Sequence, residues 1–342
     1  MATTISDKLL AWYDRHCRDL PWRAPPGTPV ADPYRVWLSE IMLQQTTVAA
    51  VKPYFAAFTQ WWPTVADLAG APEADILAAW AGLGYYSRAR NLVKTARIVS
   101  QRGGFPDTEA GLRDLPGLGA YTAAAIAAIA FGRRAVVVDA NVERVVSRLF
   151  AIQQPLPAAR KSIRTHADAI TPGNRAGDYA QAMMDLGATI CTSRAPRCLL
   201  CPLRGECAAE KSGTPERFPI KPRKVTKPVR TGTAFWIERN GAVWLVRRPA
   251  KGVFGAMRAL PGDGWTARDD GSGKAPVEGD FVEKGTVRHG FTHFSLELAV
   301  RQAVVPVTPQ GEGEWWPIED LPDAGLPTLF AKAARLILAG RN

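Results

Sequence analysis

The sequence predicts two domains of different class, an all-α domain over residues 1–210 and an α+β domain over residues 231–342, joined by a linker over residues 211–230. Apolar residues before the linker recur at helical spacing, whereas strand-like patterns begin only after it. The linker itself combines prolines with a run of basic residues. A chain of 342 residues is long enough to build a hydrophobic core in each domain.

Composition and charge narrow the class of partner. Hydrophobic residues make up 46% of the chain and the formal net charge is +11. These values indicate a soluble globular protein and favour a polyanionic partner, with nucleic acid ahead of a membrane surface. The alternative is a basic protein that binds nothing acidic. Residues 1–8 lack the apolar core of a signal peptide, and no apolar run reaches membrane length. We expect a monomer without membrane association, cytoplasmic and associated with the nucleoid if the source is bacterial.

The linker over residues 211–230 carries seven Lys or Arg residues against a single Glu. Four prolines disfavour regular structure in this segment, namely Pro215, Pro219, Pro222 and Pro228. We therefore expect an extended basic tether that contacts DNA or a protein partner in repair or replication. The alternative is a solvated linker without a partner.

A candidate acid lies on the second predicted helix, which begins after Asp32 with Pro33 at its first position. On this helix Glu40 lies four residues after Val36 and three after Trp37, so the three side chains share one face. Burial on an apolar face raises the pKa of a carboxyl group and lets it hold a proton near neutral pH. The alternative is a core glutamate whose hydrogen bonds are satisfied.

The stretch from Leu115 to Gly119 places two glycines before a helix that is predicted over residues 122–131. Gly117 and Gly119 free the backbone for a tight turn. Amide N–H groups at the start of the helix would then point outward at the positive end of its dipole, which suits a phosphate. The alternative is an ordinary helix-turn-helix in which the glycines serve only as caps.

Two further stretches combine features that suit nucleic-acid contact or acid–base chemistry. Residues 82–90 join a glycine turn, aromatic residues and arginines, a combination that suits base stacking and phosphate contact. The alternative for this stretch is a turn between core helices with surface arginines. Asp139 ends the apolar run 136–138 and is predicted to cap a helix. Capping does not exclude a chemical role for its carboxylate.

Four of the five cysteines crowd into one short segment, as Cys191, Cys198, Cys201 and Cys207. Without a secretory signal, such a cluster indicates a metal site rather than disulfides. A zinc ribbon normally shows two Cys-x2-Cys pairs on separate turns, whereas this segment has one pair with unequal flanks. We therefore favour a [4Fe–4S] cluster over zinc, and the local closure of the loop suggests a structural role.

The C-terminal domain opens with a hairpin signal, two strand-like runs over residues 235–239 and 243–246 on either side of an Asn-Gly pair. Residues 286–300 are also rich in strand formers, and residues 328–339 are expected to form a closing helix. This order of elements predicts a small α+β domain.

Together these features resemble the helix-hairpin-helix DNA glycosylases that carry an iron–sulfur loop. Endonuclease III-like members have a lysine nucleophile just after the hairpin glycines, where this chain has Tyr121, so no Schiff base is expected. The match is instead to the adenine DNA glycosylases of the MutY type. The motifs that carry it are residues 20–23, 37–46, 82–86 and 181–187, and with the cysteine loop they span most of the helical domain.

This resemblance implies a reaction and roles for four residues. The protein would flip an adenine out of double-stranded DNA, where it is mispaired with 8-oxoguanine or guanine, and hydrolyse its N-glycosidic bond. Glu40 is the implied acid, which protonates the base and then activates water. Asp139 is implied to stabilise the oxocarbenium ion, as carboxylates do in glycoside hydrolysis. Tyr121 and Asn141 are implied to position Asp139 and the sugar.

The same resemblance implies three sets of DNA contacts. The residues that match the pocket for the flipped base are Trp22, Arg23 and Gln181. The residues implied to enter the base stack or to read the opposite base are Leu43, Gln44, Gln45 and Tyr85. The hairpin glycines Gly117 and Gly119 are implied to grip a phosphate.

The second domain resembles the Nudix-like domain of the same family. A working Nudix hydrolase needs a glutamate-rich helix with an Arg-Glu pair to hold magnesium, and residues 262–285 contain no such segment. We therefore expect this domain to bind rather than to hydrolyse. Phe291, Thr292 and His293 match the family's loop that reads 8-oxoguanine, usually Phe-Ser-His, and the β-branch of Thr292 stiffens the hydroxyl-bearing side chain. The alternative is a surface hairpin with a stray histidine.

Three other functions compete with this interpretation. A glycosylase that also cuts the strand at oxidised pyrimidines is opposed by Tyr121 at the position of the lysine. A non-catalytic iron–sulfur protein would bind the mismatch and release no base. A nucleotide pyrophosphatase in the C-terminal half would need the metal-binding helix that residues 262–285 lack.

Overall fold

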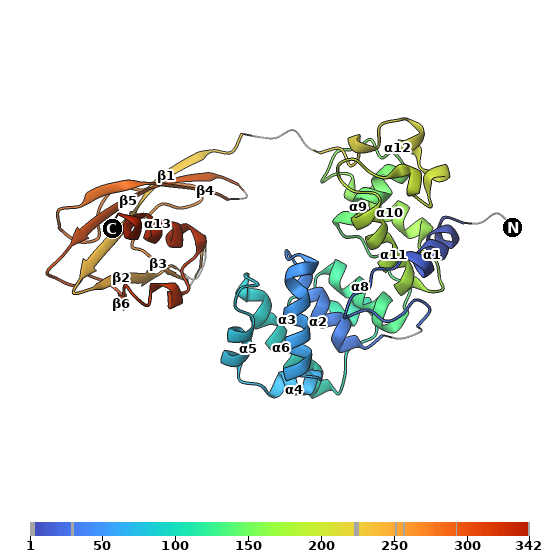
Figure 1. The fold of residues 1–342 in the computed structure, drawn as a ribbon, viewed down its shortest axis with the longest axis horizontal. Helices are drawn as coiled ribbons and strands as arrows, with labels where there is room; N and C mark the ends of the chain where they lie inside the picture. Colours follow the sequence, from blue (N-terminus) through green and yellow to red (C-terminus); the bar gives the residue numbers. More distant parts are fainter. Residues whose placement is uncertain are drawn as a thin grey trace. The chain divides into compact units, whose positions relative to one another are not determined.

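The computed structural model describes residues 4–28, 31–221, 226–249, 252–255, 257–291 and 293–340. The chain divides into two compact units, Met1–Arg223 and Lys224–Asn342 (Figure 1). The first unit is helical and the second contains a sheet, which confirms the predicted fold class. Within the described part of the chain, none of the helices has the length and apolar character needed to span a bilayer.

The first unit consists of short helices joined by turns. The elements before the cysteine loop are α1 (Ile5–His16), α2 (Pro33–Leu43), α3 (Val48–Trp61), α4 (Val65–Gly70), α5 (Glu73–Ala79), α6 (Tyr86–Arg102), α7 (Glu109–Arg113), α8 (Ala120–Phe131), α9 (Ala140–Leu149), α10 (Arg160–Ile170) and α11 (Ala176–Thr189). The elements of the loop and after it are η1 (Cys198–Leu200), η2 (Arg204–Glu206), α12 (Ala208–Lys211) and η3 (Pro215–Arg217).

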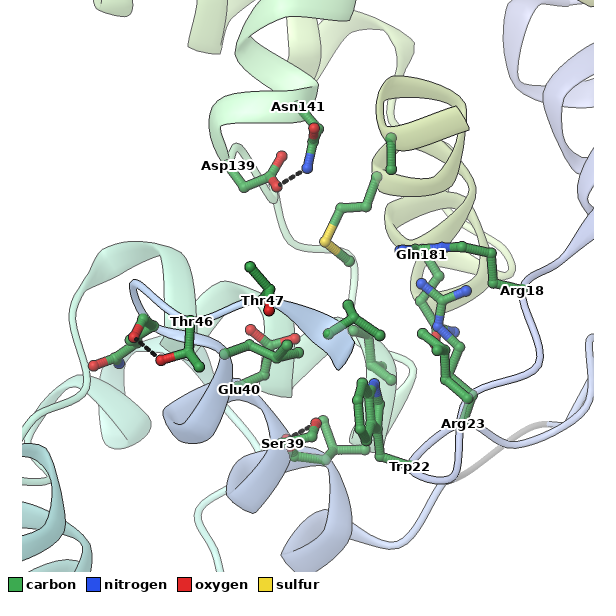
Figure 2. Close-up of a pocket in the computed structure, with 18 of the residues that line it drawn as sticks. Arg18, Trp22, Arg23, Ser39, Glu40, Thr46, Thr47, Asp139, Asn141 and Gln181 are labelled. Carbon is green, nitrogen blue, oxygen red and sulfur yellow. Dashed lines mark hydrogen bonds between the residues drawn. The ribbon is translucent and has the colours of Figure 1, made fainter. Parts of the chain in front are cut away.

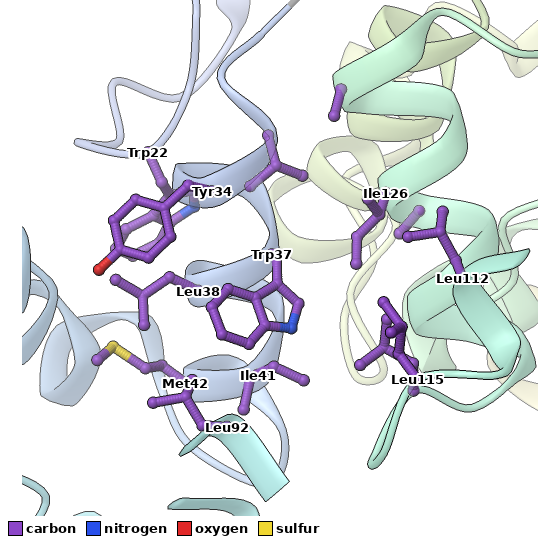
Figure 3. Packing of buried hydrophobic residues seen from close by; sticks show 14 of the residues in the cluster. Trp22, Tyr34, Trp37, Leu38, Ile41, Met42, Leu92, Leu112, Leu115 and Ile126 are labelled. Atoms are coloured by element: carbon purple, nitrogen blue, oxygen red, sulfur yellow. The ribbon is translucent and has the colours of Figure 1, made fainter. Parts of the chain in front are cut away.

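Two hydrophobic cores divide this unit into two lobes. One core joins α2 to α8, and Figure 3 shows Trp37 and Ile41 of α2 facing Leu115 and Ile126. The second core joins α1 to α9, α10 and α11. The alanine-rich helix α8 contributes side chains to both cores, so it connects the lobes. The space between the lobes is where the candidate site lies.

The sequence explains where α2 and α9 begin, the two helices that matter most for the site. The Asp32 carboxylate accepts a hydrogen bond from the Tyr34 amide, and Pro33 occupies the first turn of α2, as predicted. The Asp139 carboxylate accepts from the Val142 amide at the start of α9, also as predicted. Both helices therefore have start positions that are set by local sequence.

The first half of the predicted linker does not form an extended tether. α12 ends at Lys211, η3 lies within the linker, and Phe218 is only 2% exposed. Arg148 Nε donates a hydrogen bond to the Phe218 carbonyl oxygen at 3.1 Å. The prediction of an extended tether relied on the prolines and the charge of the linker and did not account for the burial of Phe218. Residues 222–225 lie outside the described part of the chain.

The second unit is built on a mostly antiparallel sheet with strand order β3-β2-β1-β5-β4, and β6 pairs with β2. Its elements are β1 (Val229–Arg239), β2 (Ala242–Arg247), β3 (Arg258–Ala259), β4 (Val282–Gly290), β5 (Ser295–Val304), β6 (Glu314–Pro317), η4 (Leu321–Ala324) and α13 (Thr328–Ala339). β1 and β5 run parallel. The predicted hairpin is present between β1 and β2, where Asn240 and Gly241 both have positive φ.

The two faces of this sheet are covered differently. α13 packs on one face over a core that includes Trp236, Leu298 and Phe330. The other face carries a smaller cluster around Phe235 and Trp244. The predicted closing helix over residues 328–339 is thus confirmed, and it closes the main core of the second unit.

The contact between α8 and α11 depends on a residue without a side chain. A Cβ added at Gly177 of α11 would lie 2.6 Å from the Ala128 carbonyl oxygen and 2.9 Å from Ile129 Cα. We predict that Gly177→Ala lowers the free energy of unfolding by about 1–3 kcal/mol, because backbone atoms cannot yield as a flexible side chain can. Chemical denaturation of the full chain measures the change.

Gly173→Ala is the matched control, since a Cβ at Gly173 meets no atom within 4 Å. This control is expected to be neutral or to stabilise by up to about 1 kcal/mol. Equal destabilisation by both substitutions would contradict the close-packing explanation.

Candidate active site

A cavity of about 570 Å³ opens between the two lobes of the helical unit (Figure 2). This volume is in the range of small-molecule and nucleobase pockets. Residues of α2 and the loops beside it line one side, and residues of α9 and α11 line the other. The predicted site residues that line the cavity are Trp22, Arg23, Glu40, Leu43, Gln44, Gln45, Tyr121, Asp139, Asn141 and Gln181.

Glu40 is the buried acid of this cavity, with a relative exposure of 7%. Burial raises the pKa of its carboxyl group to about 7, and the nearby charge of Asp139 adds to this effect. A hydrogen bond with the Tyr121 hydroxyl and the positive charge of Arg23 partly offset the rise. The prediction that α2 places a carboxyl group in apolar surroundings is therefore confirmed by its geometry, and Glu40 can hold or release a proton near neutral pH.

Asp139 presents a fully engaged carboxylate at the start of α9. Its Oδ1 accepts a hydrogen bond from the Val142 amide at 2.7 Å, and its Oδ2 accepts one from Asn141 Nδ2 at 2.8 Å. Figure 2 shows Asn141 directed at Asp139 beside the cavity. Two N–H donors and the positive end of a helix all complement a negative charge. Asp139 is thus both a cap and a fixed anionic group of the cavity.

Tyr121 contacts the acid rather than the capping carboxylate. Its hydroxyl shares a hydrogen bond with Glu40 and lies 3.4 Å from Met184 Sδ. Burial and the neighbouring carboxyl groups raise the pKa of Tyr121 well above its usual value, so the hydroxyl keeps its proton and acts as a donor. Asn141 contacts Asp139 as expected. The expected role of Tyr121 in positioning Asp139 and the sugar stays a prediction, and its interaction with Glu40 is an additional one.

A hydrogen-bonded path that sequence analysis missed leads from Asp139 to the cysteine loop. Asn141 Oδ1 accepts from Arg144 Nη2 at 2.8 Å, and Arg144 Nε donates to the Cys191 carbonyl oxygen at 2.7 Å. Arg144 Nη2 also donates to the Gly187 carbonyl oxygen at 2.6 Å. One arginine therefore fixes Asn141 against both α11 and the loop. Spacing on α9 could have indicated it, because Arg144 lies one turn after Asn141.

A second missed residue is Asp185, which lies inside the motif over residues 181–187, where sequence analysis assigned a role only to Gln181. Its carboxylate is fully buried and accepts two hydrogen bonds from the Arg23 guanidinium, at 2.6 and 2.8 Å. Arg18 donates to it from Nε at 2.5 Å and from its backbone amide at 3.0 Å. Two arginines that line the cavity are thus anchored on one buried carboxylate. The bidentate geometry fixes the plane of the Arg23 guanidinium.

The residues predicted to enter the base stack lie at two turns, the Gln44–Gln45 tip after α2 and the Tyr85 tip before α6. Gln45 is exposed and has a left-handed backbone with φ of 58°. Tyr85 is 65% exposed, has φ of 49° and does not line the cavity. Arg88, which the sequence suggested for phosphate contact or the surface, is instead buried at 8% exposure. The sequence pattern did not separate this inward arginine from the exposed Arg90.

The hairpin before α8 confirms one glycine requirement and corrects another. Gly117 has φ of 80°, in the left-handed region that favours glycine. Gly119 has φ of −81° and ψ of 178°, which any residue adopts, so its backbone freedom is not needed for the turn. Gly119 is the N-cap of α8 and supplies no side-chain cap, so the first amides of α8 have no partner from it.

All four clustered cysteines line one small cavity together with Arg148 and Arg204. Arg148 Nη1 lies 3.3 Å from Cys191 Sγ and donates to the Thr192 carbonyl oxygen at 2.7 Å. Burial raises the pKa of Cys201 to about 11, so its thiol holds its proton unless a cation takes the proton's place. Among the described residues, no three His, Cys, Asp or Glu side chains are arranged to hold a single ion.

The second unit holds the loop that sequence analysis linked to the opposite base. The Phe291 ring stacks on Phe294, with centroids 4.4 Å apart and an interplanar angle of 17°. The Phe291 amide donates to the Phe294 carbonyl oxygen at 2.8 Å, and Lys227 Nζ donates to the Phe291 carbonyl oxygen at 2.7 Å. His293 is exposed, and Thr292 lies outside the described residues.

Two protein families match different parts of the chain. The family described as HhH-GPD superfamily base excision DNA repair protein matches residues 38–169, and the NUDIX domain family matches residues 233–336. Adenine DNA glycosylase of Homo sapiens is 33% identical over 98% of this chain and 74% of its own length. Adenine DNA glycosylase of Buchnera aphidicola is 36% identical over 75% of this chain and 73% of its own length.

Solved structures resemble the helical unit. A thermostable thymine-DNA glycosylase is 32% identical with a TM-score of 0.54, over 60% of this chain and 95% of its own. A non-covalent endonuclease III–DNA complex has a TM-score of 0.50 and 24% identity, over 61% of this chain and 94% of its own. The second likeness is one of fold alone.

We predict that Asp185→Asn lowers the free energy of unfolding by about 3–5 kcal/mol, because it leaves two arginines next to a buried site without their counter-charge. Asp168→Asn is the control, since Asp168 pairs with Arg134 on the surface, where both side chains are about half exposed. Loss of such a pair costs about 1 kcal/mol or less. Thermal and denaturant unfolding measure both changes, and similar costs for the two substitutions would contradict the anchoring role of Asp185.

Proposed function

The chain belongs to the family of adenine DNA glycosylases, and from this premise we propose that it hydrolyses the N-glycosidic bond of adenine mispaired with 8-oxoguanine or guanine in double-stranded DNA. One observation carries the proposal. A buried acid, Glu40, and an anchored carboxylate, Asp139, line the same nucleobase-sized cavity between the two lobes. These are the two groups that departure of adenine from a deoxyribose requires.

Glu40 supplies the proton in this mechanism. Adenine is a poor leaving group until a ring nitrogen is protonated, and a carboxyl group with a pKa of about 7 holds a proton while it remains acidic enough to give it up. The Tyr121 hydroxyl orients that carboxyl group. After the base has left, the Glu40 carboxylate accepts a proton from the attacking water.

Asp139 responds to the positive charge that forms on the sugar. As the bond to the base breaks, the deoxyribose becomes an oxocarbenium ion, and a nearby anion stabilises it electrostatically or by a transient covalent bond. Asn141 and the Val142 amide hold the carboxylate in place, so little reorganisation is needed during the reaction. Arg144 in turn holds Asn141.

The rest of the helical unit would hold the extruded nucleotide and the duplex. Trp22, Arg23 and Gln181 line the cavity around the base. Gln44, Gln45 and Tyr85 would occupy the gap that the base leaves in the stack. The first amides of α8, after Gly117 and Gly119, would bind a phosphate at the helix N-terminus. A monomer is sufficient for these contacts.

The second unit would read the base opposite adenine. Phe291 and His293 belong to a loop that is already shaped by the stack on Phe294, and the aromatic ring and imidazole suit contact with a purine. Thr292 would add a hydroxyl group to this loop. The basic residues from Lys211 to Arg230 favour DNA as the partner through charge.

A [4Fe–4S] cluster fits the cysteine loop. Four thiols around one cavity match the ligand set of such a cluster, and the Arg148 guanidinium beside Cys191 complements thiolate charge. Cys191, Cys198, Cys201 and Cys207 would hold it. When bound, the cluster would fasten the loop, whose Cys191 carbonyl oxygen accepts the hydrogen bond from Arg144.

The proposed function is tested with labelled duplexes that contain adenine opposite 8-oxoguanine, guanine or cytosine. We expect free adenine and an intact abasic strand from the first two duplexes, with the 8-oxoguanine duplex preferred. Glu40→Gln should slow release by about 100-fold or more because it removes the acid, while binding to the duplex is retained. Glu143→Gln, on α9 outside the cavity lining, is the matched control.

Further measurements on the same protein test the role of Glu40 and the absence of a Schiff base. The single-turnover rate should fall as pH rises through about 7, where Glu40 loses its proton. The folded state favours the protonated form of Glu40, so this residue contributes stability below pH 4.5 that is lost as pH rises through 7. Glutamine stays neutral at every pH. Glu40→Gln should therefore raise the free energy of unfolding by about 3 kcal/mol above pH 7. Borohydride trapping of a Schiff base, or undiminished release by Glu40→Gln, would refute the proposed mechanism.

The identity of the cofactor is a separate prediction. The purified protein should show a broad visible absorption band and about four iron atoms per chain by elemental analysis. Cys198→Ser should lower the iron content and the melting temperature, whereas Cys17→Ser, outside the cluster, should leave the iron content unchanged. One zinc per chain in place of iron would overturn the assignment.

A further inference from the structure

Arg88 of α6 is a buried arginine that makes its contacts with backbone carbonyl groups rather than with an acid. Its Nη1 donates to the Ile41 and Met42 carbonyl oxygens at 3.1 and 2.9 Å. Its Nη2 donates to the Leu83 and Gly84 carbonyl oxygens at 2.9 and 3.3 Å. Burial lowers the pKa of this guanidinium, but the carbonyl dipoles around it compensate its charge.

These contacts join two segments that are far apart in the sequence. Ile41 and Met42 are in the last turn of α2, one and two residues after Glu40. Arg88 Nη2 also donates to Thr46 Oγ1 at 3.2 Å. Thr46 Oγ1 in turn donates to the Gln44 carbonyl oxygen at 3.2 Å. The Gln44–Gln45 tip is therefore connected to the Arg88 guanidinium through Thr46.

The second segment is the glycine turn before α6. The Arg88 guanidinium carbon lies 5.3 Å from the centroid of Trp80 and 5.6 Å from that of Tyr85. Trp80 Nε1 donates to the Gly84 carbonyl oxygen at 3.1 Å, which closes the turn around the arginine. The exposed Tyr85 ring therefore rests on the cation that also binds the end of α2.

We propose that Arg88 is a positioning residue that holds the Gln44–Gln45 tip and the Tyr85 tip in one fixed arrangement, so that both enter the DNA stack together when adenine is extruded. This inference rests on the proposed function. Both tips have a left-handed residue, Gln45 and Tyr85, whose backbone conformation costs energy and persists only where the surroundings hold it. A single planar group with donors on both sides provides that restraint.

The test is a double-mutant cycle on the full chain. Arg88→Met keeps most of the side-chain volume and removes every donor, and we expect it to slow single-turnover adenine release by about 10- to 100-fold. In a background that already carries Gln45→Ala and Tyr85→Ala, the same substitution should slow release by less than about twofold, because the tips it positions are gone. The pH at which the rate falls should stay unchanged.

Two controls keep the outcome interpretable. Arg97→Met, on the same helix but exposed and paired with Glu73, should leave the rate unchanged in both backgrounds. Thr46→Val removes one acceptor of Arg88 with little change in volume, and should show the same loss of effect in the double-alanine background if Arg88→Met does not fold. Fluorescence of a 2-aminopurine next to the target adenine reports extrusion without any base release.

The outcomes are distinct. Equal fold-changes from Arg88→Met in the two backgrounds, in rate and in fluorescence, would overturn the positioning role. Absence of adenine release from every duplex by the unmodified protein would refute the proposed function instead, and the fluorescence change on binding would then decide the role of Arg88 by itself.

Discussion

The burial of one carboxyl group, that of Glu40, is the constraint on which the rest of the helical unit depends. Burial is the largest cause of the raised pKa of Glu40, and burial requires that α2 be held firmly against its neighbours. The helix is fixed at its start by Asp32 and Pro33. Its apolar side packs against α7 and α8 in the first core. The raised pKa of Glu40 thus depends on the packing of the lobe that surrounds it.

The opposite wall of the cavity is built on a different principle. Asp139 is not buried in apolar surroundings but surrounded by donors, from the Val142 amide and from Asn141. Arg144 extends this arrangement to the Cys191 carbonyl oxygen, so the shape of the cysteine loop and the position of Asp139 are connected by three consecutive hydrogen bonds. The two carboxyl groups of the cavity therefore differ in their surroundings, since Glu40 is buried on an apolar helix face and Asp139 accepts two N–H hydrogen bonds at a helix start.

The sequence was sufficient wherever the information was local. The caps at Asp32 and Asp139, the apolar face of Glu40 and the Asn-Gly hairpin all follow from residues within one turn of each other. The anchors were missed because their partners lie far away in the chain. Asp185 binds Arg18 and Arg23 more than 160 residues earlier, and Arg88 binds carbonyl groups more than 40 residues earlier. A pattern of residue types does not reveal whether an arginine points inward, and Phe218 shows the same for an aromatic residue within a basic, proline-rich segment.

The stack of Phe291 on Phe294 has a consequence for how quickly a lesion could be found. Phe291 is already held in the free protein, by the ring contact and the backbone hydrogen bond with Phe294 and by the Lys227 ammonium at its carbonyl oxygen. A recognition loop that must first fold on each base pair would remain at that base pair for the time that folding takes. A reader that is rigid beforehand loses no time in this way, so it could pass along undamaged sequence rapidly and pause only where the chemical fit is right.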